Sequence, residues 1–221
     1  MHEIKVAIVG ANGKMGIIAT DVVNQLPGYK IVAKVGRTDD LDKILKLTNP
    51  DIAIELTSNI SVLKNTQIII KNKVRPIVGS SGLTSIEMQN LAMECDEIKL
   101  GGLILPNFSL GVACLNKIAG TLKDHFSDFS ILEYHHRAKK DKPSGTARHM
   151  AQLLDVKEDE IASIRSDGFI AKLQLYANSP FERIMLDHES FDRKSFAPGI
   201  ILSLKKIMEL KQLIIGLENI I

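Results

Sequence analysis

Residues 5–16, which read KVAIVGANGKMG, decide the fold of this chain. Lys5 to Val9 is a short β-branched run typical of a buried strand, and a glycine-rich turn of the form G-x-x-G-x-x-G follows it from Gly10 to Gly16. Ile17 to Leu26 continues as an apolar-periodic helix that Pro27-Gly28 stops. A strand, a glycine turn and a helix in this order are typical of a dinucleotide-binding unit, in which the glycines let the backbone approach a pyrophosphate at the helix N-terminus.

Strands and helices go on alternating through the first half. We expect strands over residues 31–35, 51–56, 76–78 and 98–105, and helices over residues 60–72 and 84–94. Thr57-Ser58-Asn59 would cap the first of these helices, and Thr84 with Glu87 forms a capping box for the second. This alternation predicts an α/β fold with a Rossmann-like, doubly wound parallel sheet. Ligands bind such sheets beyond the carboxyl ends of the strands, where the glycine turn and the loops 79–82 and 105–109 would meet.

The pattern changes in the second half. A helix over residues 109–126 precedes expected strands over residues 129–133, 161–165, 170–176 and 181–187, with turn signals at Asp167-Gly168 and Asn178-Ser179-Pro180. Strands joined by short turns predict a mixed or antiparallel sheet in a second, α+β substrate domain. Gly199 to Leu217 is apolar at helical spacing and is expected to pack back on the first domain. We therefore expect a dinucleotide-binding domain of residues 1–107 plus 197–221 and a second domain of residues 108–196.

A candidate reaction centre lies at residues 133–147, EYHHRAKKDKPSGTA. The expected strand ends near His135 and His136, and because neighbours on a strand point to opposite faces, one imidazole could handle protons while the other binds charge. Lys139 lies among Arg137, Lys140 and Lys142, and this positive charge would attract a carboxylate. The same composition also fits a solvated surface loop without any chemistry.

The turn after these cations reads as a helix start. Ser144 is a candidate N-cap for a helix over residues 146–154, and Gly145 and Thr146 follow it. Free backbone amides and two hydroxyls at this position would form an anion cradle beside the histidines. The whole segment thus indicates a small, carboxylate-bearing substrate.

Composition excludes several classes of protein. The 221 residues carry 28 basic and 26 acidic side chains, a net charge of +2, which argues against a nucleic-acid binder. We see no signal peptide, no apolar run long enough to span a bilayer and no metal-ligand spacing. Cys95 and Cys114 lie in apolar helical contexts and are expected to be buried thiols, which fits a reducing cytoplasm.

The second expected strand ends where dinucleotide folds usually place an acidic residue for the adenine ribose. Gly36 occupies this position and Arg37 follows it, so a 2′-phosphate meets no repulsion and could pair with a guanidinium. We therefore predict that NADPH is used at least as well as NADH. In the alternative, Arg37 is an ordinary solvated arginine and Asp39 or Asp40 takes the acidic role.

These motifs resemble the 4-hydroxy-tetrahydrodipicolinate reductase family, also called dihydrodipicolinate reductases. The resemblance rests on VAIVGANGKMG, VGSSG, LPNFSLGV, EYHHRAKKDKPSGTA and HESFDRKSFAPGI, which occur in family order along nearly the whole chain. It implies hydride transfer from NADPH or NADH to a cyclic imine dicarboxylate with loss of water, giving tetrahydrodipicolinate in the diaminopimelate route to lysine. It also implies a homotetramer formed through the second domain.

The resemblance assigns residues to roles. His135 resembles the family's proton donor or acceptor and Lys139 its second proton donor, while His136, Ser144, Gly145 and Thr146 would bind the substrate carboxylates. The pyrophosphate would be held by Gly10, Ala11, Asn12, Gly13, Lys14 and Met15, with Gly36 and Arg37 at the adenosine ribose. The nicotinamide would be flanked by Gly79, Ser80, Ser81, Leu105, Pro106, Asn107 and Phe108. The chain departs from the family in Gly36, in serines where threonines are usual at 80 and 81, and in a short second domain.

Two other functions remain open from the residues. One is another two-domain enzyme, such as an aspartate dehydrogenase, which would need a different motif in its second domain. The other is a regulator that binds NADPH or NADH without turnover, which would not need a proton-donating histidine and lysine. His188 and Arg193, near the return to the first domain, are candidates for supporting or hinge residues, or for ordinary surface positions.

Overall fold

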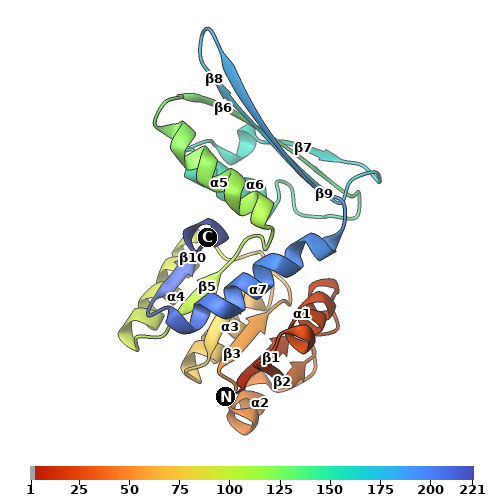
Figure 1. Ribbon diagram of the computed structural model, residues 1–221, viewed down its shortest axis with the longest axis vertical. Helices are drawn as coiled ribbons and strands as arrows, with labels where there is room; N and C mark the ends of the chain where they lie inside the picture. Colours follow the sequence, from red (N-terminus) through yellow and green to blue (C-terminus); the bar gives the residue numbers. More distant parts are fainter. Residues whose placement is uncertain (1–2) are drawn as a thin grey trace. The chain divides into compact units, whose positions relative to one another are not determined.

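The computed structural model describes residues 3–221, and the chain divides into two units. Unit 1 consists of residues 3–108 with 197–220, and unit 2 of residues 109–196 with 221. The chain thus leaves unit 1, builds unit 2 and returns to unit 1, as the colour gradient of Figure 1 shows.

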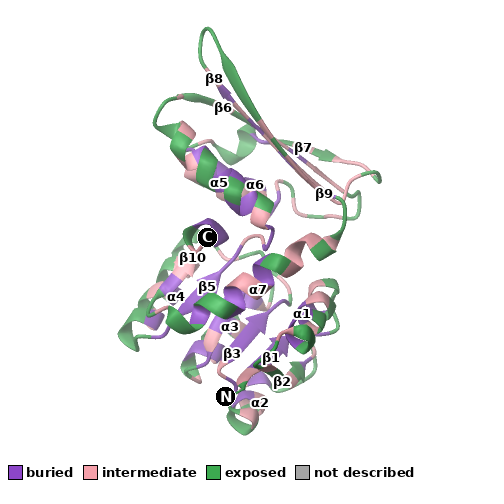
Figure 2. Cartoon of the chain, in the orientation of Figure 1, coloured by how far each residue is buried: buried purple, intermediate pink, exposed green. Residues whose placement is uncertain are grey.

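Unit 1 is built on a parallel sheet that, within the described residues, has six strands in the order β10-β5-β4-β3-β1-β2. The strands are β1 (Ile4–Val9), β2 (Tyr29–Val35), β3 (Ile52–Glu55), β4 (Arg75–Val78), β5 (Gly102–Ile104) and β10 (Leu213–Ile215). Figure 2 shows β1, β3 and β5 buried, with the exposed residues on the surrounding helices. The α/β, Rossmann-like prediction is confirmed.

Helices cover both faces of this sheet. They are α1 (Lys14–Gln25), α2 (Leu41–Thr48), α3 (Val62–Lys71), α4 (Ser85–Glu97) and α7 (Ala197–Lys206). Alternate residues of β1 point to opposite faces, so Ala7 and Val9 pack with Leu45 of α2 and Ile69 of α3, while α1 packs beside α7. Burial on both faces explains why these strands are continuous apolar runs.

Unit 1 differs from expectation in three features. The segment over residues 199–217 is not one helix, because α7 ends at Lys206 and the short strand β10 then pairs with β5. Helix α2 was not expected at all. The start of α3 is not capped by residues 57–59, because Ser61 is its N-cap residue and makes no side-chain capping bond. The capping box of Thr84 and Glu87 is present as predicted.

Unit 2 has a mixed sheet in the order β7-β6-β8-β9, formed by β6 (Asp128–His135), β7 (Ala162–Arg165), β8 (Ala171–Asn178) and β9 (Arg183–Ser190). β6 pairs in parallel with β7 and antiparallel with β8, which forms a hairpin with β9. The turn at Asp167-Gly168 therefore closes no hairpin, because β6 lies between β7 and β8. Helices α5 (Leu110–Lys123) and α6 (Gly145–Leu153) contribute Leu115 and Met150 to a core with Ile131 and Leu175 of the sheet.

Short 3-10 turns occur at residues 158–160, 193–196, 207–209 and 217–219. Over residues 3–221, no helix combines the length and the apolar character that crossing a bilayer requires. Cys95 is buried in α4 as expected, whereas Cys114 is exposed on α5, contrary to the prediction of two buried thiols; both are free.

Candidate active site

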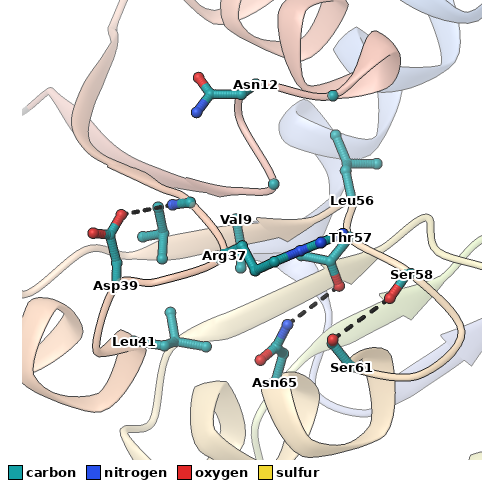
Figure 3. Close-up of a pocket in the computed structure, with 14 residues that line it drawn as sticks. Val9, Asn12, Arg37, Asp39, Leu41, Leu56, Thr57, Ser58, Ser61 and Asn65 are labelled. Atoms are coloured by element: carbon teal, nitrogen blue, oxygen red, sulfur yellow. Dashed lines mark hydrogen bonds between the residues drawn. The ribbon is translucent and has the colours of Figure 1, made fainter.

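The carboxyl ends of β1, β2 and β3 surround a cavity of about 400 Å³ in unit 1. The strand order reverses at β1, which has β2 on one side and β3 on the other, and such a switch point is where open α/β sheets bind ligands. Figure 3 shows side chains from all three strand ends around this cavity. Its lining residues are Val9, Gly10, Asn12, Gly13, Val35, Gly36, Arg37, Asp39, Leu41, Leu56, Thr57, Ser58, Ser61 and Asn65.

The glycine turn is fitted closely to the neighbouring strand. Gly10 has φ of 85°, and a Cβ there would lie 2.5 Å from the carbonyl oxygen of Leu56. A Cβ on Gly16 would lie 2.2 Å from the carbonyl oxygen of Gly10, so the turn and α1 approach each other more closely than any other residue permits. Helix α1 begins at Lys14, and its N-cap residue Gly13 offers no side-chain cap to the first amides. The positive partial charge of these amides favours the binding of an anion.

The predicted pyrophosphate residues divide into two sets. Gly10, Asn12 and Gly13 line the cavity, whereas the side chain of Ala11 is buried and Lys14 and Met15 lie in the first turn of α1.

The end of β2 presents both a cation and an anion to the cavity. Arg37 and Asp39 both line it, and the backbone N–H of Gly36 donates to Oδ2 of Asp39 over 2.7 Å. Asp40 instead accepts from the backbone N–H of Lys43 over 3.1 Å and is the N-cap of α2. Figure 3 shows Arg37 directed toward Thr57, away from Asp39. Of the two acids that the sequence left open, Asp39 is thus the one at the cavity.

A polar cluster at the end of β3 was missed from the sequence. Glu55 is fully buried, and its Oε1 accepts hydrogen bonds from the hydroxyl of Thr57 and from Nδ2 of Asn65, the latter over 3.1 Å. Nδ2 of Asn65 also lies 3.2 Å from Oγ1 of Thr57. Thr57 and Asn65 are therefore fixed at the cavity wall by a buried carboxylate. The available signal was an acid inside the apolar run DIAIEL.

The loops after β4 and β5 lie against each other. A Cβ on Gly79 would lie 2.3 Å from Cε2 of Phe108, so the glycine leaves the space that the ring occupies. Leu105 and Phe108 are buried, Ser80, Pro106 and Asn107 are half-buried, and Ser81 is exposed. Of the predicted nicotinamide residues, the structure brings Gly79 and Phe108 into contact, and none of the seven lines the cavity at the ends of β1 to β3.

In unit 2, His135 is the last residue of β6, and Glu133 lies two residues earlier on the same face of the strand. Glu133 is fully buried, and its Oε2 lies 3.1 Å from Nδ1 of His135, whose side chain is 14% exposed. Oε1 of Glu133 accepts from Nη2 of Arg165 over 2.8 Å and from the backbone N–H of Ser144 over 3.1 Å. Burial by itself raises the pKa of Glu133, but the contacts from His135, Ser144, Arg165 and Ser163 outweigh it and hold the pKa well below its usual range.

The loop between β6 and α6 carries the remaining predicted residues. Nζ of Lys139 lies 2.9 Å from Oδ1 of Asp141, and both side chains are 31% exposed. His136 is half-exposed: its Nδ1 accepts from the backbone N–H of Ala138 over 3.1 Å, and its Nε2 lies 3.6 Å from Oδ1 of Asp167. His135 and His136 thus have different environments, one against a buried carboxylate and the other near solvent.

Ser144 begins α6 as expected. Its Oγ accepts from the backbone N–H of Ala147 over 3.2 Å, and Gly145 and Thr146 form the first turn of the helix. Because the first amides of a helix lack intrahelical partners, this turn can receive a carboxylate. Glu133 and Arg165, which connect this turn to His135, were not identified from the sequence. In the part of the chain that the structure describes, His, Cys, Asp and Glu side chains form no group of three that could hold a metal ion.

Comparisons with known proteins show which family the chain resembles. Residues 4–108 match the family described as dihydrodipicolinate reductase, N-terminus, and residues 109–221 match dihydrodipicolinate reductase, C-terminus. A 4-hydroxy-tetrahydrodipicolinate reductase of Coxiella burnetii is 35% identical over 237 residues, covering 99% of each chain. A dipicolinate-bound dihydrodipicolinate reductase from Paenisporosarcina sp. TG-14 superposes with a TM-score of 0.83 and 30% identity, over 99% of this chain and 100% of that one.

An aspartate dehydrogenase from Thermotoga maritima shares the fold alone, with a TM-score of 0.58 and 11% identity over 93% of this chain and 97% of that one. The two family matches, by contrast, together span residues 4–221 and include both the glycine turn of unit 1 and the His135 to Thr146 segment of unit 2. The chain therefore belongs to the dihydrodipicolinate reductase family.

Proposed function

We propose that this chain reduces 4-hydroxy-tetrahydrodipicolinate to tetrahydrodipicolinate, in the diaminopimelate route of lysine synthesis. The net reaction consumes one NADPH or NADH and one proton, and releases one water and the oxidised nucleotide. The observation that carries the proposal is the membership of both halves in one reductase family. The segment of His135, Lys139 and Ser144 supports it, because cations and a helix N-terminus lie near a histidine that contacts a buried carboxylate.

The residues of unit 1 fit a nicotinamide dinucleotide. The backbone around Gly10 and Gly16 leaves no room for a Cβ, and this close approach exposes the first amides of α1 to a pyrophosphate. We assign Gly10, Ala11, Asn12, Gly13, Lys14 and Met15 to the pyrophosphate, and Gly79, Ser80, Ser81, Leu105, Pro106, Asn107 and Phe108 to the nicotinamide. When bound, the nicotinamide supplies the hydride.

Arg37 and Asp39 support the use of both nucleotides. A guanidinium at the cavity can pair with a 2′-phosphate, and a carboxylate at the same cavity can accept from a ribose hydroxyl. Gly36 presents no side chain to either, and its amide already holds Asp39 in place. We propose that NADPH is used at least as well as NADH.

In unit 2 we assign the proton chemistry to His135 and Lys139. His135 has one ring nitrogen against Glu133, which leaves Nε2 to exchange a proton with substrate. Lys139 is held by Asp141 and can donate a second proton. His136, Ser144, Gly145 and Thr146 would bind the two carboxylates, because an imidazole beside the cationic loop and the N-terminus of α6 both favour anions.

We also propose roles for the two units and a setting for the protein. Unit 1 would bind the dinucleotide, and unit 2 would bind the substrate and assemble the chain into a homotetramer, which light scattering on the purified protein would test. Both cysteines are free thiols, which fits a reducing cytoplasm.

The decisive experiment follows NADPH and NADH oxidation by absorbance while the upstream synthase generates substrate from pyruvate and aspartate semialdehyde. We expect oxidation that depends on the synthase and is lost in His135→Gln and Lys139→Ala, with NADPH binding retained. If both variants oxidise NADPH like the wild type, the catalytic assignment is wrong. If the wild type binds NADPH but never oxidises it, a regulator without turnover becomes the better function.

A further inference from the structure

The carboxylate of Glu133 is the centre of a buried charge cluster in unit 2. Glu133 has no exposed surface, and the side chain of Arg165 is only 13% exposed. Their shortest contact is 2.8 Å, from Nη2 of Arg165 to Oε1 of Glu133. Burying such a pair costs desolvation that a well-packed apolar pair would avoid, so charge at this position points to a role beyond stability.

Arg165 joins this carboxylate to the loop that carries Lys139. The same Nη2 that contacts Glu133 also donates to the carbonyl oxygen of Asp141 over 2.6 Å, and Nη1 donates to the carbonyl oxygen of Ile164 over 2.9 Å. Asp141 in turn lies 2.9 Å from the ammonium of Lys139. The planar guanidinium fixes the two N–H groups of Nη2 and the donor on Nη1 relative to one another, a geometry that a freely rotating ammonium does not hold.

The other oxygen of Glu133 faces His135. Oε2 lies 3.1 Å from Nδ1 of the ring, an ion-pair distance at an angle short of a hydrogen bond, and neither of these buried atoms makes a hydrogen bond elsewhere. Oε1 accepts from Arg165 and from the amide of Ser144. The negative charge of this carboxylate favours the tautomer with the proton on Nδ1, the nitrogen nearest to it, and this tautomer leaves Nε2 without a proton.

We propose that Glu133 and Arg165 are positioning residues for the reaction: Glu133 fixes the tautomer and orientation of His135, and Arg165 fixes the 136–144 loop, with Lys139, to the same carboxylate. One buried ion pair thereby fixes the positions of both His135 and Lys139, the residues to which the proton transfers are assigned. The inference rests on the proposed function for its catalytic consequence, but its structural content can be tested without substrate.

Glu133→Gln tests the first half. The amide oxygen of the glutamine is expected to stay with Arg165 and Ser144, which turns its NH₂ toward Nδ1 of His135. Because an NH₂ donates, the ring should switch to the tautomer protonated on Nε2. NMR of ¹⁵N-histidine-labelled protein reads the tautomer directly, with His135→Gln identifying the signal. The matched control is Glu182→Gln, which changes an exposed glutamate of the same unit.

The kinetic expectation is a fall in kcat of about 10²-fold in Glu133→Gln. The KM for NADPH should change by less than about twofold, since unit 1 is untouched. An unchanged His135 tautomer, or a kcat equal to that of Glu182→Gln, would overturn the proposal. If the wild type lacked reductase activity but the tautomer still switched, the proposed function would fail and the positioning of His135 would stand.

Arg165→Lys tests the proposed role of Arg165 in positioning the 136–144 loop. It also provides a test of the proposal if Glu133→Gln does not fold. Lysine keeps the charge near Glu133 but not the fixed arrangement of donors to Glu133, Asp141 and Ile164, so kcat should fall about tenfold while the His135 tautomer stays as in the wild type. Arg183→Lys is the control, because Arg183 is an exposed arginine that donates to Asn178 and lies over Tyr176. Equal kcat in the two arginine variants would contradict the proposal that Arg165 positions the 136–144 loop.

Discussion

The ring of Phe108 occupies the position that a side chain on Gly79 would need: a Cβ at residue 79 would lie 2.3 Å from Cε2 of the ring. Phe108 is 3% exposed, so the ring cannot swing into solvent without losing its burial. The loops after β4 and β5 are thus held in one arrangement by the absence of a single methyl group.

Gly79→Ala is therefore expected to lower the free energy of unfolding by about 1–3 kcal/mol, through overpacking. It should also raise the KM for NADPH, because these loops are the proposed nicotinamide site. Urea unfolding and steady-state kinetics measure both effects. Gly120→Ala is the control: no atom lies within 4 Å of its Cβ position in α5, and alanine there should be neutral or mildly stabilising. Equal stability of the two variants would contradict the packing argument.

Arg37→Ala should weaken NADPH more than NADH. Removing a guanidinium from a 2′-phosphate costs about 1–3 kcal/mol, so kcat/KM for NADPH should fall about tenfold or more with little change for NADH. Asp39→Ala should act mainly on NADH, by removing a ribose acceptor and the partner of the Gly36 amide. Lys64→Ala, an exposed cation on α3, is the control. If Arg37→Ala left the ratio of the two nucleotides unchanged, the arginine would be an ordinary solvated side chain.

The lowered pKa of Glu133 predicts acid sensitivity. A carboxyl whose folded pKa lies below its unfolded value stabilises the fold above the unfolded pKa, about 4.3 for glutamate, and that stability is lost as the pH falls below about 5. Glu133→Gln should cost about 3 kcal/mol near neutral pH and much less in acid, because protonation removes the same interaction in the wild type. Urea unfolding at a series of pH values measures the difference. A cost that did not change with pH would contradict this account.

His188 predicts a second pH dependence, of different origin. Burial lowers the pKa of His188 against a weaker opposing effect of Asp187, and Nε2 of the ring lies 3.1 Å from Oγ of Ser109. Because the unfolded chain binds a proton more readily, this contribution to stability is present above about pH 6.5 and is lost as the pH falls below it. Thermal unfolding between pH 5 and 8 should be less pH-dependent in His188→Gln. His125→Gln, at an exposed histidine, should leave the wild-type dependence intact.

The two thiols should differ in reactivity. Burial raises the pKa of Cys95 to about 12, so its thiolate is scarce at neutral pH, whereas Cys114 is exposed. Treatment of the native protein with an excess of alkylating agent should modify Cys114 and spare Cys95, as judged by peptide mass spectrometry. Unfolding in urea should expose both. Equal labelling in the native state would contradict the burial of Cys95.

The elements that carried a strong local signal were predictable. The glycine turn between a buried strand and a helix, the Thr84 and Glu87 capping box and the Ser144 N-cap all depend on residues close in sequence. The errors in secondary structure came mainly from short elements. β10 has three residues, and its pairing with β5, more than helical periodicity, decides its conformation. α2 has eight residues, and Asp40, a candidate ribose ligand from the sequence, is its N-cap.

The residues of the candidate site could be predicted where they lie close together in the sequence. They could not be predicted where strands distant in the sequence bring them together. His135, Lys139 and Ser144 share one loop region, so the sequence displays them together. Arg165 reaches Glu133 only because β7 pairs in parallel with β6, a register that no local pattern specifies. Glu55 and Glu133 were visible in the sequence as acidic residues inside apolar strands, and both are buried. An acidic residue in an apolar strand indicates a hydrogen-bonding or cationic partner elsewhere in the chain.

The pairing of β10 with β5 bears on how the protein is made. Residues 102–104 emerge from the ribosome long before residues 213–215, and residues 109–196 of unit 2 are synthesised between them. Until residues 213–215 are synthesised, the edge of β5 in the nascent first unit therefore stays unpaired. Chaperones or neighbouring nascent chains can contact this edge during that time. Unit 2 is contiguous apart from its final residue and has no such delay, so the later-made unit can finish folding before the earlier one.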